Sequence, residues 1–436
     1  MQQQLSDNMN ILFIYNATQT YTNTVLEHIN SFAHYAHNTN AFFCHQDQKK
    51  PFNVNLSYFD AVVLHYTIRL PFDQVADTTV EALASYSGLK VLFIQDEYDH
   101  THRTWYWIKR LGIQLVFTVV PQENIGKVYP SNEFPGVRFV NNLTGYVPEN
   151  IPNIDTVNSP SSRKIIVGYR GRSLPLRYGQ LGKEKVGIGR QVKEYCVSNN
   201  IHHDIAWAEN SRIYGPKWYE FMASCRAMLS SESGSNVFDW NGTLDAQIKE
   251  FRRSKRGVTD QEVYDKVIKP YEEHGLMNQI SPRIFEAIAF RTALVLYEGD
   301  YSGIIKPDRH FISLKKDGSN LDKIFLLLQD GEYVDEITNR AYDEIILSGA
   351  YSYQAFVRMV HKELTQAIKS REIKEANWLL IENTTGHKRQ PSELTTSPYV
   401  LVSRKFNLLV RIVYRILERL PMGPKILQSL KKGLRQ

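Results

Sequence analysis

The sequence predicts an α/β protein built from two parallel-sheet domains. Short apolar runs recur in both halves of the chain, among them residues 10–15, 61–64 and 164–169. These runs lack the alternation of apolar and polar residues that marks a sheet with one face in water, and stretches of helical spacing separate them. The chain has 436 residues, a length that favours two domains over a single core.

The first domain is predicted over residues 9–155. Pro and Asn accumulate between residues 146 and 160, a composition typical of a linker between domains. A helix is expected at residues 25–36. Apolar runs with the length of buried strands lie at residues 10–15, 61–64, 91–94 and 115–120.

The second domain is predicted over residues 160–380. Its strands are expected at residues 164–169, 227–229 and 293–296, with helices between them. A polar, highly charged stretch at residues 237–278 interrupts this order, and we interpret it as a helical insertion.

A connector rich in Thr, Ser, Gly and Pro is predicted at residues 383–400, followed by a basic amphipathic helical tail at residues 401–436. The tail holds nine Arg and Lys against one Glu and so carries +8, whereas the whole chain carries +6. The rest of the chain is therefore close to −2, which argues against nucleic-acid binding by the body of the protein. The tail is typical of a helix that lies on an anionic membrane surface or binds a partner, although a helix packed on the body would show the same pattern.

The three Cys residues, at positions 44, 196 and 225, are too far apart in the sequence for a metal cluster or a disulfide framework. This usage favours a reducing, cytoplasmic compartment. The N-terminus lacks the basic and apolar regions of a secretory signal, and no window reaches the roughly 18 apolar residues that a membrane span needs. We expect a cytoplasmic protein, peripheral on the inner membrane face if the tail binds lipid.

The most informative motif lies at residues 281–292. Ser281–Pro282–Arg283 opens a short predicted helix that carries Glu286, and the chain then enters the apolar run 293–296. Ligands of parallel α/β domains gather at the carboxyl ends of the strands, where this order places Glu286. The motif resembles the donor-side signature of GT-B glycosyltransferases, in which the Glu of a Glu-Ala-x-Ala segment holds the ribose of a nucleotide-sugar. The continuation at residues 301–317 is similar to the polysaccharide-synthesis branch of that group.

This resemblance implies a GT-B fold, in which two Rossmann-like domains face a central cleft, with the nucleotide-sugar on the second domain and the acceptor on the first. It is specific over residues 165–353 and only topological before them. The donor substrate would be a UDP- or GDP-linked sugar, and no metal or further cofactor is expected. The chain holds no Asp-x-Asp motif, which argues against the metal-clamped GT-A type of transferase.

A basic turn follows the strand predicted at residues 164–169. Its Gly and two Arg, at positions 170–172, offer backbone amides and guanidinium groups to a diphosphate. The turn is similar to the Gly-Arg…Lys-Gly element of GT-B enzymes, whose Arg and Lys neutralise the departing diphosphate. Arg172 and Lys185 match best, with Arg170 and Lys183 as alternatives. A solvated basic loop would show the same residues.

Small residues at positions 230–236 allow a ligand to approach the backbone, with Ser233 and Gly234 as candidate contacts. The resemblance gives Glu232 the role of the family's first Glu, which contacts the sugar ring. The usual pair of Glu with seven residues between them is absent, because Asn278 stands where the first should be. We expect the insertion to have separated the two carboxylates, although Glu232 also suits an ordinary turn. The family usually has a Gly before the Thr that corresponds to Thr292. Here Arg291 stands in its place and could bind a phosphate.

Titratable groups follow the first-domain run 91–94. A general base near neutral pH needs a carboxylate of raised pKa or a His, and Asp96, Asp99 and His100 are candidates. A metal site is a weaker interpretation of the same cluster. Thr22, Thr24 and His28 are expected to line the acceptor side.

We therefore expect a metal-independent glycosyltransferase that moves a sugar from a nucleotide-diphosphate sugar to a hydroxyl of a glycan or lipid-linked acceptor in polysaccharide biosynthesis. Glu232 would position the sugar, and retention or inversion of configuration is open. Two alternatives remain at this stage, a sugar-nucleotide epimerase of the same fold and a non-catalytic glycan- or lipid-binding subunit of an assembly complex.

Overall fold

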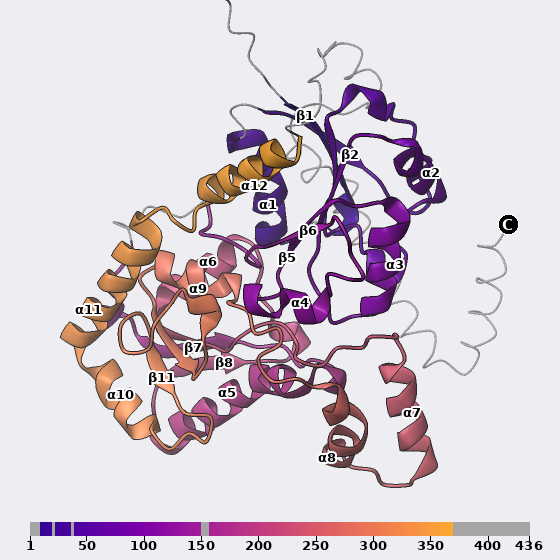
Figure 1. Ribbon diagram of the computed structural model, residues 1–436. Helices are drawn as coiled ribbons and strands as arrows, with labels where there is room; N and C mark the ends of the chain where they lie inside the picture. Colours follow the sequence, from indigo (N-terminus) through magenta and orange to yellow (C-terminus); the bar gives the residue numbers. More distant parts are fainter. Residues whose placement is uncertain (1–8, 20–21, 36–38, 150–156, 369–436) are drawn as a thin grey trace, which may run out of the picture.

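A computed structural model of the chain describes residues 9–19, 22–35, 39–149 and 157–368 (Figure 1). The predicted connector at residues 383–400 and the basic tail at residues 401–436 lie outside the described residues. Among the residues that are described, no helix combines the length and the apolar character needed to span a bilayer.

The first domain contains a six-stranded parallel sheet in the order β2-β1-β3-β4-β5-β6. Its strands are β1 (Met9–Tyr15), β2 (Thr39–His45), β3 (Ala61–Leu64), β4 (Leu89–Phe93), β5 (Leu115–Thr118) and β6 (Arg138–Asn141). The connecting helices are α1 (Asn23–Tyr35), α2 (Asp77–Ser85), α3 (Thr101–Leu111) and α4 (Ile125–Val128).

The second domain contains a five-stranded parallel sheet in the order β11-β10-β9-β7-β8. Its strands are β7 (Ile165–Arg170), β8 (His203–Ala206), β9 (Cys225–Ser230), β10 (Ala293–Tyr297) and β11 (Ile312–Leu314). The helices that flank it are α5 (Gly179–Ser198), α6 (Pro216–Ser224), α9 (Pro282–Ala289), α10 (Leu321–Gln329) and α11 (Gly331–Ala341).

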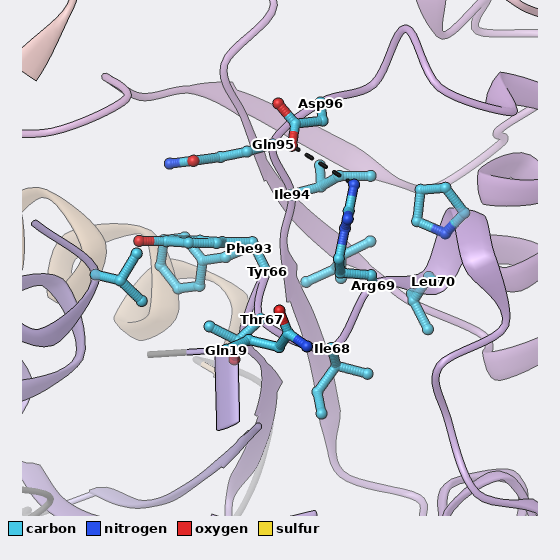
Figure 2. A pocket seen from close by; sticks show the side chains of 13 residues that line it. Gln19, Tyr66, Thr67, Ile68, Arg69, Leu70, Phe93, Ile94, Gln95 and Asp96 are labelled. Atoms are coloured by element: carbon cyan, nitrogen blue, oxygen red, sulfur yellow. Dashed lines mark ion pairs between the residues drawn. The ribbon is translucent and has the colours of Figure 1, made fainter. Parts of the chain in front are cut away.

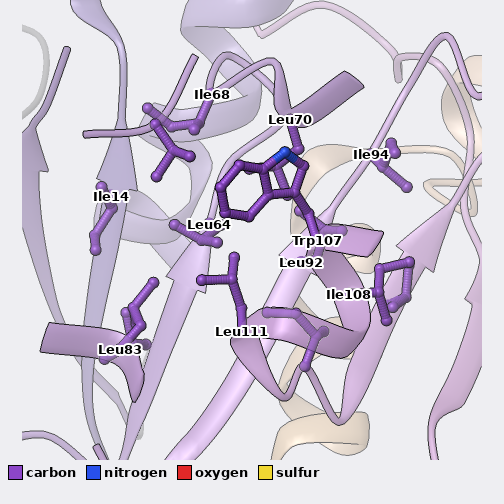
Figure 3. Packing of buried hydrophobic residues seen from close by; sticks show 14 of the residues in the cluster. Ile14, Leu64, Ile68, Leu70, Leu83, Leu92, Ile94, Trp107, Ile108 and Leu111 are labelled. Atoms are coloured by element: carbon purple, nitrogen blue, oxygen red, sulfur yellow. The ribbon is translucent and has the colours of Figure 1, made fainter. Parts of the chain in front are cut away.

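Both faces of the first sheet are buried, which explains why its strands read as unbroken apolar runs. All seven residues of β1 are buried. Leu12 and Ile14 join a core with α2 and α3, in which Trp107 and Ile108 pack on the sheet (Figure 3). The residues that alternate with them join a second core with α1 on the opposite face. The predicted α/β class with two parallel sheets is confirmed.

The last described helix, α12 (Tyr353–Ile368), belongs to the core of the first domain. Its apolar residues Phe356, Val360 and Leu364 pack in the same cluster as Phe13 of β1 and Phe32 of α1. Figure 1 shows α12 beside α1. The range predicted for the second domain, residues 160–380, thus includes a helix whose apolar face completes the first domain's core.

The stretch at residues 237–278 forms α7 (Leu244–Ser254), α8 (Asp260–Val263) and a π turn at Tyr264–Ile268, with a small core of its own. Figure 1 shows α7 and α8 projecting away from both sheets. The two ends of the stretch return to the first domain, where Phe238, Leu276 and Met277 join its core. The insertion thus packs against both domains.

Candidate functional site

The two sheets share a doubly wound strand order, 2-1-3-4-5 when strands are numbered within each domain, and β6 extends the first sheet by one strand. Ligands of such sheets bind at the carboxyl ends of the strands on either side of the point where the order reverses. In the second domain that point lies between β7 and β9, and in the first between β1 and β3. A cavity lies at the carboxyl ends of strands in each domain.

The cavity beside β7, called here the cleft pocket, has walls from both domains and a volume of about 280 Å³. Thr22–Thr24, of which Thr22 and Thr24 were expected on the acceptor side, form its first-domain wall. The second-domain wall consists of Arg170–Arg172, Arg212–Gly215, Trp218, Ser281–Arg283 and Glu286. The structure thus brings together the basic turn and the Glu286 motif, which are more than 100 residues apart in the sequence.

Glu286 lies on α9, whose first turn begins with Pro282, a residue suited to that position. The indole nitrogen of Trp218 donates a hydrogen bond to Glu286 Oε2 over 2.9 Å. Burial raises the pKa of Glu286, and the Trp218 N–H and the charge of Arg283 oppose this shift. The carboxylate is held by a neighbouring helix and lines the pocket.

Two cations of the cleft pocket are free of ion pairs within the described part of the chain. Arg172 is exposed at the pocket, and Arg283 lies with its guanidinium 5.2 Å from the Trp218 ring centre and 5.5 Å from that of Tyr169. Guanidinium groups in such positions suit a phosphate.

Lys185 lies on α5 and reaches the loop after β9. Its Nζ is 3.3 Å from the carbonyl oxygen of Glu232 and 3.2 Å from Ser233 Oγ. Burial lowers the pKa of Lys185 to about 8, and the nearby charge of Arg283 acts in the same direction. A Cβ at Gly171 would stand 2.9 Å from the Lys185 carbonyl oxygen, so this Gly lets the basic turn approach α5.

The two alternative cations make other contacts. Arg170 lines the pocket, but its guanidinium pairs with Asp204 at 2.8 Å and stacks 4.2 Å from the ring centre of Phe221. Lys183 Nζ lies 3.9 Å from the ring centre of Tyr264 in the insertion. Residues two apart on a helix point in different directions, so the structure turns Lys183 towards the insertion and Lys185 towards the loop.

Glu232 is buried and already hydrogen-bonded by three donors of the protein. Its carboxylate accepts from the backbone N–H groups of Asp300 at 3.1 Å and Tyr301 at 2.9 Å, and from Asn278 Nδ2 at 2.5 Å. Burial raises its pKa against these donors. The insertion thus returns Asn278, which stands eight positions before Glu286, to the side of Glu232.

Glu232 also lines a second interdomain cavity of about 520 Å³, called here the Glu232 cavity. Its first-domain wall is Pro121–Glu123 and Asn141, and its second-domain wall includes Glu298–Asp300 and Lys316. Gly234 does not line this cavity. With φ at 90°, it would place a Cβ 2.0 Å from the Met277 carbonyl oxygen, so its small size serves packing against the insertion.

Arg291 lies away from these cavities, with its guanidinium 4.6 Å from the ring centre of Tyr342. The expectation that it binds phosphate is therefore not supported by its position. Its φ is 49°, a conformation that favours glycine, which accounts for the Gly at this place in the family it resembles.

The three candidate bases of the first domain lie in different surroundings in the structure. Asp96 is exposed and lines a pocket of about 200 Å³ at the ends of β3 and β4, called here the first-domain pocket. Arg69 Nη2 lies 3.9 Å from its carboxylate across this pocket (Figure 2). Asp96 therefore keeps a position from which it can meet a ligand.

Asp99 and His100 face the second domain and the insertion. The buried Asp99 carboxylate pairs with Arg177, which precedes α5, and lies 3.9 Å from Arg69. Burial raises its pKa, and Arg177 opposes the shift. The His100 ring lies against the backbone of Gly242, where a Cβ would stand 2.5 Å from Nδ1. These contacts fit interdomain packing better than catalysis.

His28, expected on the acceptor side, is buried behind the first-domain pocket. Its Nδ1 lies 3.0 Å from Nε2 of the buried His65, which in turn contacts Thr67 Oγ1 at 3.0 Å. Burial lowers the pKa of His28 to about 3, so both rings are neutral at physiological pH.

Trp218, Arg212 and Tyr214 belong to the cleft pocket but were not predicted from the sequence. The aromatic helix around Trp218 is visible in the sequence, but nothing in the sequence connects Trp218 to Glu286, 68 positions away.

A second group that was not predicted is Glu97, a buried carboxyl whose Oε1 accepts a hydrogen bond from the backbone N–H of Val119 at 3.1 Å. Within the described ranges, no group of three His, Cys, Asp or Glu is placed to hold a metal.

No protein-family model matches the sequence, and no curated protein matches it significantly. Solved structures that resemble this one include T4 phage BGT in complex with UDP-glucose, at 13% identity and a TM-score of 0.47, covering 82% of this chain and 99% of that one. HepE of Anabaena in complex with UDP has 10% identity and a TM-score of 0.43, with 82% and 100% covered. TarM of S. aureus has 15% identity and a TM-score of 0.37, with 70% and 55% covered.

The architecture itself is clear from the topology. Two doubly wound domains face a cleft whose pockets have walls from both, and α12 returns to the first domain. The chain has the GT-B fold.

Proposed function

We propose that this protein is a glycosyltransferase that moves a sugar from a nucleotide-diphosphate sugar to an acceptor hydroxyl. The observation that carries the proposal is the convergence of Arg172, Arg283 and Glu286 in one pocket, with Lys185 at the adjoining loop. Three cations and one carboxylate at the ends of β7 and β9 match a ligand that joins a diphosphate to a ribose.

In the transfer, the bond from the anomeric carbon to the diphosphate breaks and its electron pair leaves with the phosphate. A new bond forms between that carbon and the acceptor oxygen, whose proton passes to a base. The diphosphate gains negative charge as it leaves, and fixed cations stabilise such charge strongly in a site shielded from water. We assign this task to Arg172, Arg283 and Lys185, without a bound metal.

The sugar would extend from Lys185 towards the Glu232 cavity. The Glu232 side chain accepts three hydrogen bonds from the protein, so its role would be to hold the loop at Asp300–Tyr301 around the sugar. The first-domain pocket would take the acceptor, with Asp96 as the base. We propose a glycan or lipid-linked hydroxyl in polysaccharide biosynthesis as this acceptor.

Calorimetric titration with UDP, GDP, CMP and ADP tests the proposal. One nucleotide should bind to the wild-type protein, and Glu286→Ala and Arg172→Ala should each weaken that binding about 10- to 100-fold, the effect of losing a charged hydrogen bond. Arg190→Ala, an exposed change on α5, is the control. EDTA should leave the affinity unchanged.

The bound nucleotide then selects the sugars for a transfer assay. Binding without transfer to any hydroxyl acceptor would favour a non-catalytic subunit, and the failure of all four nucleotides to bind would overturn the donor site itself.

A further inference from the structure

Trp218 connects two helices at the cleft pocket. It lies in the first turn of α6, and its indole N–H reaches Glu286 on α9. Its ring packs 5.9 Å from that of Phe221, one turn later on α6, which restricts the orientation of the indole. Among the described residues, no other hydrogen bond reaches the Glu286 carboxylate, so Oε1 is available to a ligand.

The ring of Trp218 also contacts the cation next to Glu286. The Arg283 guanidinium lies 5.2 Å from the ring centre, and a second ring, that of Tyr169, lies 5.5 Å away. Such a position over an aromatic face attracts a guanidinium. Trp218 thus contacts both an anion and a cation of the pocket, through different parts of one side chain.

Arg283 and Glu286 stand three positions apart on one helix, a spacing at which opposite charges normally pair. Although both residues lie in the described part of the chain, no ion pair joins them. The carboxylate is bonded to the indole N–H and the guanidinium lies over aromatic rings, so the two groups form no ion pair, while the charge of Arg283 still acts to lower the pKa of Glu286. If they paired, each would lose the free charge that a ligand needs.

We infer that Trp218 is a positioning residue of the nucleotide site: it separates Glu286 from Arg283, so that one carboxylate oxygen faces the ribose hydroxyls while the guanidinium faces the diphosphate. This inference rests on the proposed function. It assigns Trp218 no contact with the reacting atoms and concerns only the geometry of the two charged groups.

Trp218→Phe tests the inference because it keeps an aromatic face for Arg283 and removes the N–H. The probes are the nucleoside diphosphate that the wild type binds and its 2′,3′-dideoxy analogue, which lacks the ribose hydroxyls. The variant should bind the normal nucleotide about tenfold more weakly, the effect of one hydrogen bond to a charged group, and the analogue less than twofold more weakly.

A pH profile gives a second readout. Loss of the N–H donor should raise the pKa of Glu286, because the bond favours the ionised carboxylate. The affinity of the variant for the normal nucleotide should therefore fall more steeply than that of the wild type as the pH is lowered from 8 to 5. Trp105→Phe is the matched control, since Trp105 donates its N–H to the Val128 carbonyl oxygen in the first domain. It should change neither affinity.

Equal losses for the two ligands would show that Trp218 acts only by packing, and no loss for either would also overturn the inference. If Trp218→Phe does not fold, a benzothienylalanine at this position keeps the indole shape with sulfur in place of N–H and gives the same comparison. If the wild type binds no nucleotide, the proposed function fails and this inference fails with it. Wild-type binding with the wrong pattern in the variant overturns the inference alone.

Discussion

The first-domain pocket and the cleft pocket both lie at carboxyl ends of strands in doubly wound sheets, and their charges differ. In the first-domain pocket, Arg69 lies 3.9 Å from both Asp96 and Asp99, so its charge is compensated. In the cleft pocket, Arg172 and Arg283 have no ion pair among the described residues. This difference in charge agrees with the proposal that the second domain binds the nucleotide diphosphate and the first domain binds an uncharged hydroxyl.

The largest expected effect comes from removing the proposed base in the first-domain pocket. Asp96→Asn should lower sugar transfer about 100- to 10,000-fold, because it removes the proposed base, and should change nucleotide affinity less than twofold. Transfer rates and calorimetry on the same preparation measure the two effects. Asp77→Asn, at an exposed position of α2, is the control. Full transfer by Asp96→Asn would place the base elsewhere.

Arg177→Met tests one of the contacts that join the two domains. It leaves the buried Asp99 carboxylate without its closest partner, a change that typically costs about 3–5 kcal/mol. The expected result is a clearly lower midpoint of thermal unfolding, and Asp99→Asn added to Arg177→Met should restore part of the loss. Equal destabilisation in the single and double variants would show that the ion pair is not the cause.

Lys185, beside the cleft pocket, gives the proposed nucleotide binding a pH dependence. Its pKa is lowered to about 8, so it loses its charge as the pH rises through that value. Nucleoside diphosphate affinity should fall about tenfold between pH 7.5 and 9.5, the effect of one lost charged hydrogen bond. Lys185→Arg should remove the fall, since a guanidinium stays protonated, and Lys183→Ala should leave it unchanged. An unchanged fall in Lys185→Arg would contradict this assignment.

The last prediction concerns the neutral histidines behind the first-domain pocket. The pKa of His28 is lowered to about 3 from 6.5, so the unfolded chain binds its proton first. The stabilising contribution is complete above pH 6.5 and is lost as the pH falls towards 3, at up to about 1.4 kcal/mol per pH unit for one residue. His28→Phe should reduce the acid slope of the unfolding midpoint, measured from pH 7 to 4.5. An unchanged slope would mean that other groups govern acid unfolding.

Local sequence determined much of this protein. The unbroken apolar runs specified buried parallel strands, because covering both faces of a sheet with helices leaves no place for alternating polar residues. The motif around Glu286 and the basic turn at Arg172 each lie directly beside a strand, so the chain order alone placed them at one end of the sheet.

Tertiary structure decided which of the candidate side chains share a site. Trp218 meets Glu286, and Asp99 meets Arg177, only because helices and turns far apart in the sequence pack together. Gly234 resembled a ligand contact, but its backbone lies against Met277 of the insertion. The helix α12 follows the second domain in the sequence, yet its apolar face packs in the core of the first domain. A local pattern specifies that a surface must be buried, whereas the partner that buries it is chosen by the fold as a whole.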